Sequence, residues 1–228
     1  MPETQDIDAA TDTSGRRLSD RAYERILELL FDRRLPAGAF MSQGQLVELT
    51  GIPVAPLRDA LRVLEAEGIL TIQPRSGIQF VKPGLELTKS TYQFRTILER
   101  AAVRLFAETA EDSTLSRLKK SHVALQERIE KTGLNERAIA DLEGLESALH
   151  NSVIGTLNNP LIETSYRRIH HYLRLVRLER KLTVPRALHS IREHLAIIEA
   201  CAARDADAAD AALLAHFTAA LQRHMGLV

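Results

Sequence analysis

The sequence predicts a mainly α protein in two parts: three short helices with a two-stranded β-hairpin, followed by an all-α antiparallel helical bundle. Apolar residues recur at helical spacing through most of the 228 residues, whereas β-rich runs are confined to Ile69–Gln73 and Ile78–Val81. Aromatic residues make up only 4%, and alanine and leucine are abundant, which favours helix. With 45% hydrophobic and 26% charged residues, the composition is that of a globular protein.

The composition also excludes several classes of protein. No run of about 18 uninterrupted apolar residues is present, so we expect no transmembrane helix and no membrane partner. The first residues are acidic and polar, unlike a secretory signal, and the single cysteine, Cys201, fits a reducing compartment. The expected location is therefore cytoplasmic. The formal net charge of +0 by itself announces no nucleic-acid partner.

The first helices are predicted from their end signals. Residues 1–17 are polar and lack an apolar period, so we expect a disordered tail. Ser19 can cap a helix over Ser19–Arg33, which Leu35-Pro36-Ala37-Gly38 then breaks. Ser42 to Gln45 has the spacing of a capping box, which predicts a second helix that ends at Gly51.

A third helix is predicted over Ala55–Glu67, with an inward face made of Leu57, Ala60, Leu61 and Leu64. The two β-rich runs flank Pro74-Arg75-Ser76-Gly77, which is the signal of a hairpin. Residues 18–82 therefore form the expected first domain. Lys82-Pro83-Gly84 marks its end, with residues 83–86 as the linker.

Residues 87–228 show only helical periods and predict an antiparallel bundle with short links. The six expected helices are about Leu87–Ala110, Ser113–Lys131, Asn135–Leu157, Pro160–Lys181, Val184–Arg204 and Ala206–Met225.

Three short helices followed by a hairpin are the order of a winged helix-turn-helix. In that fold the third helix enters the major groove of DNA, and the wing contacts phosphate or the minor groove. Arg58 and Arg62 would lie one turn apart on the exposed face of the third helix, with Arg75-Ser76-Gly77 at the wing tip. The alternative is that these arginines only pair with nearby acids on a solvated helix face.

Residues Leu18–Val81 resemble the N-terminal domain of the GntR family of bacterial transcription regulators. The resemblance rests on Leu35–Gly38, on G-I-P-V-A-P-L-R-D-A-L from Gly51 to Leu61, and on L-E-A-E-G-I-L from Leu64 to Leu70. It implies a homodimer that binds a double-stranded DNA operator at a pseudo-palindromic site.

This chain departs from the family pattern at the start of the third helix. The family usually has Ser or Thr, then Arg, directly before Ala55, where this chain has Pro53 and Val54. Because arginine is the usual bidentate reader of guanine, the family's base preference is not carried over. Val54 and Ala55 stay in the expected DNA-binding set, with Val54 touching a thymine methyl group or sugar.

Four side chains of the second part form a candidate metal site. Glu146 and His150 are four residues apart and share one helix face. His194 and His216 lie among apolar residues of two later helices. A carboxylate and three histidines from three helices would satisfy one another through a divalent ion. Each histidine alone could equally be bonded to a backbone carbonyl, and Glu146 with His150 could be a surface ion pair.

From about Thr88 to its end, the chain resembles the FCD-type ligand-binding domain of FadR-like GntR regulators. The matching elements are E-S-A-L-H from Glu146, N-N-P-L from Asn158 and E-H-L-A-I from Glu193. Metal-binding members use an Asp and three His, which implies Glu146, His150, His194 and His216 here. Glu replaces the usual Asp. The implied ion is zinc, with nickel and manganese as alternatives.

Arg95 with Glu99 matches an Arg-x-x-apolar-Glu element of the same family, which implies an effector-binding arginine. A guanidinium suits a carboxylate because it donates two parallel hydrogen bonds. A plain Arg95–Glu99 pair within one helix turn is the alternative. Arg174 is a second candidate, in a helix rich in arginine. The remaining histidines are expected to be structural or surface residues: His122, His170, His171, His189 and His224.

These features predict a ligand-responsive transcription regulator, which in this family is most often a repressor. Three neutral histidines and one carboxylate around a divalent ion leave a formal excess of about +1, so the site should attract a small carboxylate metabolite. One alternative is a helical metal-dependent hydrolase or lyase with the same site, although the H-E-x-x-H spacing and a Gly-rich phosphate loop are missing. Another is a binding protein that has lost DNA recognition through Pro53 and Val54.

Overall fold

The computed structural model describes residues 17–178 and 182–226, and its contacts divide the chain into two compact units. The first unit is Met1–Gly84 with Arg174–Leu178, and the second is Leu85–Leu173 with Glu179–Val228. Residues 1–16 of the expected disordered tail lie outside the described residues.

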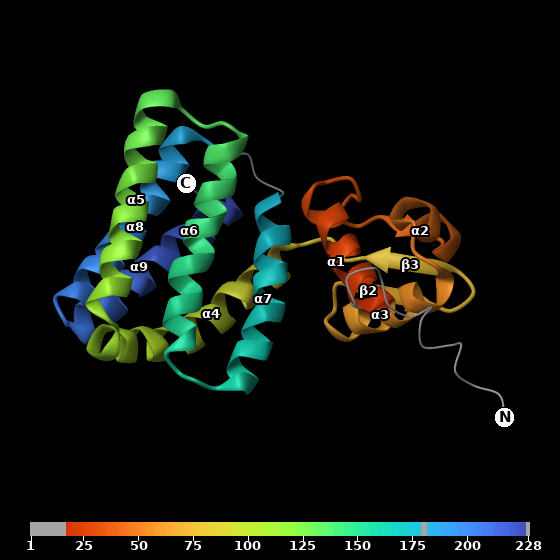
Figure 1. The fold of residues 1–228 in the computed structure, drawn as a ribbon, viewed down its shortest axis with the longest axis horizontal. Coiled ribbons are helices and arrows are strands. Elements are labelled where there is room, and N and C mark those ends of the chain that lie inside the picture. The colour runs from red at the N-terminus through yellow and green to blue at the C-terminus, as the bar shows by residue number, and fades with distance from the viewer. Residues whose placement is uncertain (1–16, 179–181, 227–228) are drawn as a thin grey trace. The chain divides into compact units, whose positions relative to one another are not determined.

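The first unit contains three helices and a small sheet (Figure 1). Its elements are α1 (Leu18–Phe31), β1 (Phe40–Met41), α2 (Gln43–Thr50), α3 (Val54–Ala66), β2 (Leu70–Gln73) and β3 (Gly77–Phe80). The strand order is β1-β3-β2 with antiparallel pairing, which confirms the winged helix-turn-helix. The sequence did not predict β1, because a two-residue strand is too short to show a period.

The end signals of the first unit were mostly confirmed. Ser42 Oγ accepts a hydrogen bond from the Gln45 amide at 3.2 Å, and Gln45 Oε1 accepts one from the Ser42 amide at 2.8 Å. Gly51 ends α2 in the left-handed conformation, with φ 71°. The prediction that Ser19 caps α1 was wrong. The Arg17 carbonyl already accepts from the amides of Asp20 and Arg21, so α1 begins before Ser19.

Gly77 lies where β3 passes close to β1. A Cβ atom at this position would lie 2.7 Å from Phe40 Cζ and 2.8 Å from the Met41 carbonyl oxygen. Because backbone must move to relieve the second contact, we expect Gly77→Ala to destabilise the first unit by about 1–3 kcal/mol, measured as a lower melting temperature.

Gly44→Ala is the matched control for this change. Its Cβ would meet only Ser42 Oγ, at 3.9 Å, and alanine favours helix α2 more than glycine does. This variant should melt at the same temperature as the wild type or slightly higher. Equal melting temperatures for Gly77→Ala and the wild type would contradict the close approach of the two strands.

The second unit is the predicted antiparallel helical bundle (Figure 1). The helices are α4 (Leu85–Thr109), α5 (Asp112–Thr132), α6 (Glu136–Gly155), α7 (Pro160–Leu178), α8 (Val184–Ala202) and α9 (Ala206–Met225). Helix α4 packs on α6, α8 and α9, and α5 packs on α6 and α8. Residues 179–181, at the expected end of the fourth bundle helix, lie outside the described residues.

The expected linker, residues 83–86, is shorter in the structure because α4 already begins at Leu85. Pro83 precedes the helix, where its missing N–H removes no helical hydrogen bond. No described helix is long and apolar enough to cross a membrane.

The core of the second unit draws residues from all six of its helices, among them Phe106, Leu118, Leu149, Tyr166, Ile197 and Phe217. Cys201 of α8 is fully buried in this core, and burial raises the pKa of its thiol to about 11. The same interior also encloses charged and polar side chains: Arg95, Glu99, His122, Glu146, His150, His194 and His216. Buried polar groups need partners, so this set marks the place to look for function.

Candidate metal centre

Three helices bring the predicted metal ligands together. Helix α6 supplies Glu146 and His150, α8 supplies His194, and α9 supplies His216. One ligand atom from each of the four residues lies within 4.8 Å of the others. All four side chains are buried, with at most 4% of any residue exposed. The surface ion pair that Glu146 and His150 might have formed is therefore excluded.

The Nε2 atoms of the histidines face the Glu146 carboxylate. His150 Nε2 lies 3.4 Å from Glu146 Oε1, and His194 Nε2 lies 3.2 Å from Glu146 Oε2. The buried Nε2 atoms of His150 and His216 make no hydrogen bond to any described residue.

The Nδ1 atoms of two of these rings are held by carboxylates. His150 Nδ1 contacts Glu99 Oε2, and His216 Nδ1 lies 2.7 Å from Glu193 Oε2. Burial lowers the pKa of both His150 and His216, so both rings are neutral at pH 7. Each ring then carries its single proton on Nδ1, where the carboxylate accepts it, and a lone pair on Nε2.

This donor set fits a divalent metal ion. Lone pairs on imidazole nitrogen and carboxylate oxygen repel one another at these distances unless a cation lies between them. A carboxylate behind a ligating histidine is the usual outer partner of such a site, since it fixes the ring's tautomer and raises its basicity. Three nitrogens and one oxygen suit zinc, nickel or manganese.

Arg95 of α4 lies beside this cluster and is itself buried. Its Nε donates to Glu99 Oε1 at 2.7 Å, and its Nη1 lies 3.4 Å from Glu146 Oε1. The guanidinium also stacks over the Phe217 ring, 4.6 Å from the ring centroid. Its buried Nη2 atom has no hydrogen-bond acceptor among the described residues. The Arg95–Glu99 pair therefore exists, and the arginine still keeps one spare donor.

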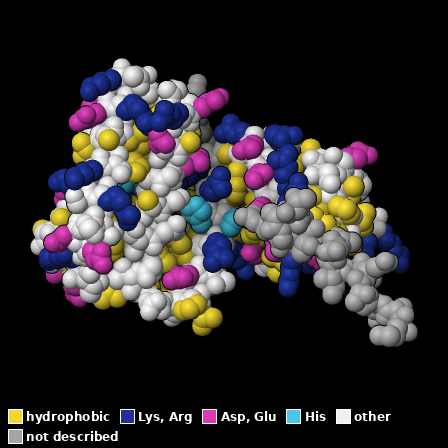
Figure 2. Space-filling model, in the orientation of Figure 1, with side chains coloured by type: hydrophobic (Ala, Val, Ile, Leu, Met, Phe, Trp, Pro, Cys, Tyr) yellow, Lys and Arg dark blue, Asp and Glu magenta, His cyan; other side chains and the backbone are white. Residues whose placement is uncertain are grey.

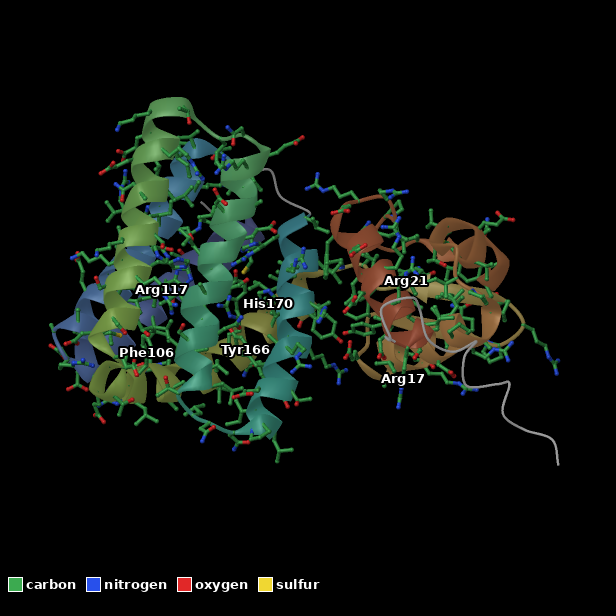
Figure 3. All side chains as sticks on the ribbon, in the orientation of Figure 1. Arg17, Arg21, Phe106, Arg117, Tyr166 and His170 are labelled. Carbon is green, nitrogen blue, oxygen red and sulfur yellow. The ribbon has the colours of Figure 1, made fainter. Side chains whose placement is uncertain are left out.

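Arg95 and Glu99 are both ionised at neutral pH. Burial works against the charge of Arg95, but the Glu99 carboxylate raises the pKa of Arg95 further above its ordinary value. Burial likewise opposes the charge of Glu99, but Arg95 dominates and lowers the pKa of Glu99 to about 2. Tyr166, labelled in Figure 3, donates to Glu99 Oε1 at 2.8 Å. Glu99 thus accepts from three helices at once.

Besides Tyr166, the sequence did not reveal Glu193 and His122 as site residues. Glu193 accepts from Arg223 at 2.8 and 2.7 Å as well as contacting His216. Although burial opposes ionisation, these two hydrogen-bond partners lower the pKa of Glu193 to about 2. His122, expected to be a structural or surface residue, is fully buried, and its Nε2 lies 3.2 Å from His194 Nδ1.

The other candidate residues of the second part make different contacts. His189 lies 3.0 Å from Glu193 on the face of α8, and His224 Nδ1 bonds the Ala220 carbonyl at 2.7 Å. His170 lies 3.4 Å from Ser147 Oγ. Arg174 belongs to the stretch Arg174–Leu178 that groups with the first unit, and its guanidinium lies over the Phe31 ring, 3.7 Å from the ring centroid.

The predicted DNA-contacting residues of the first unit lie at its surface. Val54 is 46% exposed, and Ala55, Arg58, Arg62, Arg75 and Ser76 are exposed too. Arg62 lies 3.7 Å from Asp59 in a highly exposed pair, whereas Arg58 forms no ion pair with a described residue. Gly77 is half-buried at the start of β3. Figure 2 shows Lys and Arg interspersed with Asp and Glu over the visible face.

Helix α3 begins without a side-chain cap. Its N-cap residue is Pro53, which makes no capping hydrogen bond, and Val54 is the first helical residue. The helix is otherwise as predicted, with Leu57, Ala60, Leu61 and Leu64 buried.

Comparison with known families decides the class of protein. Residues 90–219 match the model of the FCD domain, and residues 18–80 match that of the bacterial regulatory proteins of the gntR family. The chain belongs to the GntR family and carries an FCD domain. Members of this family are transcription regulators that bind DNA operators. This GntR-family chain is thus a transcription regulator, and the alternative of a metal-dependent enzyme is set aside.

Two transcriptional regulators are similar in sequence to this GntR regulator over most of their length. The HTH-type transcriptional regulator YdhC of Bacillus subtilis is 25% identical over 195 residues, which cover 86% of this chain and 85% of YdhC. The Nta operon transcriptional regulator of Aminobacter aminovorans is 27% identical over 193 residues, which cover 82% and 83% of the two chains.

Solved structures share the fold. Escherichia coli McbR/YncC has a TM-score of 0.73 at 18% identity, covering 93% of this chain and 99% of its own. A GntR regulator from Rhodococcus sp. RHA1 has the same TM-score and identity, covering 92% and 98%. The metal-free FCD domain of TM0439 has a TM-score of 0.52 at 22% identity, covering 62% of this chain and 94% of its own.

Proposed function

We propose that this GntR-family regulator is a homodimeric repressor whose FCD domain binds a divalent metal ion and a small carboxylate effector. The ligands are Glu146, His150, His194 and His216, and Arg95 binds the effector. The DNA-contacting residues are Val54, Ala55, Arg58, Arg62, Arg75, Ser76 and Gly77. A bound effector shifts the dimer between arrangements that fit and do not fit two half-sites of the operator.

The metal proposal rests on a difference between the surroundings of the two nitrogen atoms in the His150 and His216 rings. The Nδ1 atoms of His150 and His216 face ionised carboxylates, whereas their buried Nε2 atoms converge with Glu146 and make no hydrogen bond to a described residue. A site built only for packing would leave no such lone pairs unsatisfied. A divalent ion would supply positive charge at this point.

The charge balance of the cluster favours an anionic effector. Arg95 carries one positive charge, and Glu99 and Glu146 carry two negative charges, which leaves −1 with neutral histidines. A divalent ion turns this balance into +1. In a buried site of low dielectric such an excess attracts an anion strongly.

The position of the effector follows from the spare donor on Arg95. Buried Nη2 has no acceptor among the described residues, while Nη1 of the same fork lies beside the ligand Glu146. An open groove of about 540 Å³ between α5 and α6 is the rival position, lined by Arg117, Leu118, Ser121, Leu145, Ala148, Asn151 and Ser152. It contains none of the four ligands, and Arg117 in Figure 3 is exposed. We therefore place the effector at Arg95.

The DNA contact of α3 is testable at one side chain. Arg58 is exposed and forms no ion pair with a described residue, so it is available to a base or a phosphate. Arg58→Ala should weaken specific operator binding by about 1–3 kcal/mol, measured by gel shift with the DNA upstream of the gene. Folding should not change, because an exposed arginine contributes little to stability.

Arg192→Ala provides the control, since Arg192 is an exposed arginine of α8 in the other unit. It should bind the operator as the wild type does. Val54→Arg, which restores the residue usual in the family, should raise general DNA affinity. Operator affinity equal to wild type in folded Arg58→Ala protein would remove Arg58 from the DNA contact.

A further inference from the structure

A fourth histidine stands behind the metal cluster and is not one of the proposed ligands. His122 of α5 is fully buried, and its Nδ1 lies 2.7 Å from the carbonyl oxygen of Leu118 in the preceding helical turn. Its Nε2 lies 3.2 Å from Nδ1 of the ligand His194. The two ring planes meet at 73° with 5.3 Å between centroids, so the rings are joined at an edge rather than stacked.

The direction of each hydrogen bond in this row is determined by chemistry. A carbonyl oxygen can only accept, so His122 Nδ1 must carry a proton and donate it to Leu118. A charged imidazolium is strongly disfavoured in a fully buried position, so the His122 ring is neutral and its Nε2 has a lone pair. Nε2 of His122 therefore accepts a hydrogen bond from the protonated Nδ1 of His194.

The opposite direction is excluded by the same atoms. If His122 donated from Nε2, its Nδ1 lone pair would face the Leu118 carbonyl oxygen at 2.7 Å. Two acceptors that close, in a fully buried position, lose a hydrogen bond and repel each other.

We propose that His122 is a positioning residue that holds His194 in its Nδ1–H tautomer and so directs the Nε2 lone pair of His194 toward the metal. This inference rests on the metal site proposed above. It gives all three histidine ligands the same tautomer by three separate partners: Glu99 for His150, Glu193 for His216, and His122 for His194.

A neutral partner suits this position for an electrostatic reason. Each of the two outer carboxylates is matched by an arginine, Glu99 by Arg95 and Glu193 by Arg223. A third buried carboxylate behind His194 would need a cation of its own, because an unpaired buried charge is strongly unfavourable. An imidazole anchored to a backbone carbonyl accepts the same hydrogen bond and needs no counter-charge.

Tautomers in the metal-free full-length protein provide the direct test. Nitrogen-15 NMR distinguishes a protonated Nδ1 from a protonated Nε2 in each histidine ring. In wild-type protein His194 should be protonated at Nδ1. In His122→Phe, which fills the space but accepts no hydrogen bond, His194 should move its proton to Nε2, facing Glu146. In His122→Gln, whose amide oxygen reaches the position of Nε2, the Nδ1–H tautomer should be restored.

Metal affinity is the second readout, measured with zinc against a competing chelator. His122→Phe should bind zinc about 10–100-fold more weakly than wild type, as is usual for loss of an outer partner, and His122→Gln should recover most of that loss. His224→Phe removes a histidine that is also bonded to a helix carbonyl but not to a ligand, and it should bind zinc normally. If His122→Phe does not fold, His122→Asn, whose amide is too short to reach His194, takes its place.

Two results would overturn the proposal: an unchanged His194 tautomer in the variants without an acceptor, or zinc affinities in those variants equal to that of the wild type. A failure of the metal proposal itself looks different. Wild-type protein would then bind no zinc, while the tautomer measurement in metal-free protein would still report on His122.

Discussion

Replacing His194 by alanine should abolish stoichiometric metal binding and lower the thermal stability of the FCD domain. His194 brings α8 to the ligands of α6 and α9, so its loss leaves two helices to hold the ion. An ion present at about 100 times its dissociation constant stabilises the folded state by about 2.7 kcal/mol, and the variant should lose this increment. The checks are metal content per chain and melting temperature with and without chelator.

His189→Ala is the matched control, because His189 lies on the same helix but its side chain is 58% exposed. It should retain one ion per chain and the wild-type response to chelator. One equivalent of metal in the double variant His150→Ala, His194→Ala would show that the ion binds elsewhere.

Changing Arg95 should separate effector binding from metal binding and DNA binding. Alanine is a poor choice here, because removing Arg95 leaves Glu99 buried without its counter-charge. Breaking a buried ion pair in this way lowers the free energy of unfolding by about 3–5 kcal/mol. Arg95→Lys keeps the positive charge beside Glu99 but loses the planar fork that presents Nη2. We expect this variant to keep its metal and its operator affinity while binding a carboxylate effector at least about tenfold more weakly, about 1.4 kcal/mol. The complex of this variant with operator DNA should then resist release by the effector.

Coupling between the two units makes this prediction quantitative. Whatever factor the effector takes from operator affinity, the operator must take from effector affinity. Calorimetric titration of the effector into wild-type, metal-free and Arg95→Lys protein, each with and without operator DNA, measures both factors. Removing the metal should also weaken effector binding, because it removes the positive excess of the cluster. Equal effector affinity with and without operator in the wild type would disprove the coupling.

The fold was largely predictable because its end signals are local. The capping box at Ser42 and the glycine at Gly51 act through bonds between residues at most four apart, and both appear in the structure as predicted. The start of α1 was misplaced because its N-cap residue, Arg17, accepts the first helical hydrogen bonds on its backbone carbonyl but makes no capping bond with its side chain. Only a side-chain cap leaves a recognisable pattern in the sequence. Strand β1 forms by pairing with Gln79 and Ile78, far along the chain, so no local pattern announces it.

The candidate site was predictable only in part, for a similar reason. Glu146 and His150 share a face at a spacing that any helix imposes. The sequence offered His194 and His216 only as one alternative among several, which the family resemblance then supported, because nothing local fixes how α6, α8 and α9 face one another. His122 left one signal that was not used. It stands in the buried stripe of α5, with Leu118 and Leu125 on either side, where a polar ring needs a partner from another helix.

Because Cys201 is buried, the rate at which its thiol is chemically modified measures how often the core of this regulator opens. Only a thiolate reacts quickly with disulfide reagents, and both packing and a pKa of about 11 withhold the thiolate at neutral pH. Modification must therefore wait until the bundle opens, and its rate reports the free energy of that opening. The chain has a single cysteine, so the signal comes from one place without any engineering. Cys201 and His194 both lie on α8, so a metal ion that holds α8 against its neighbours should lower the rate of Cys201 modification.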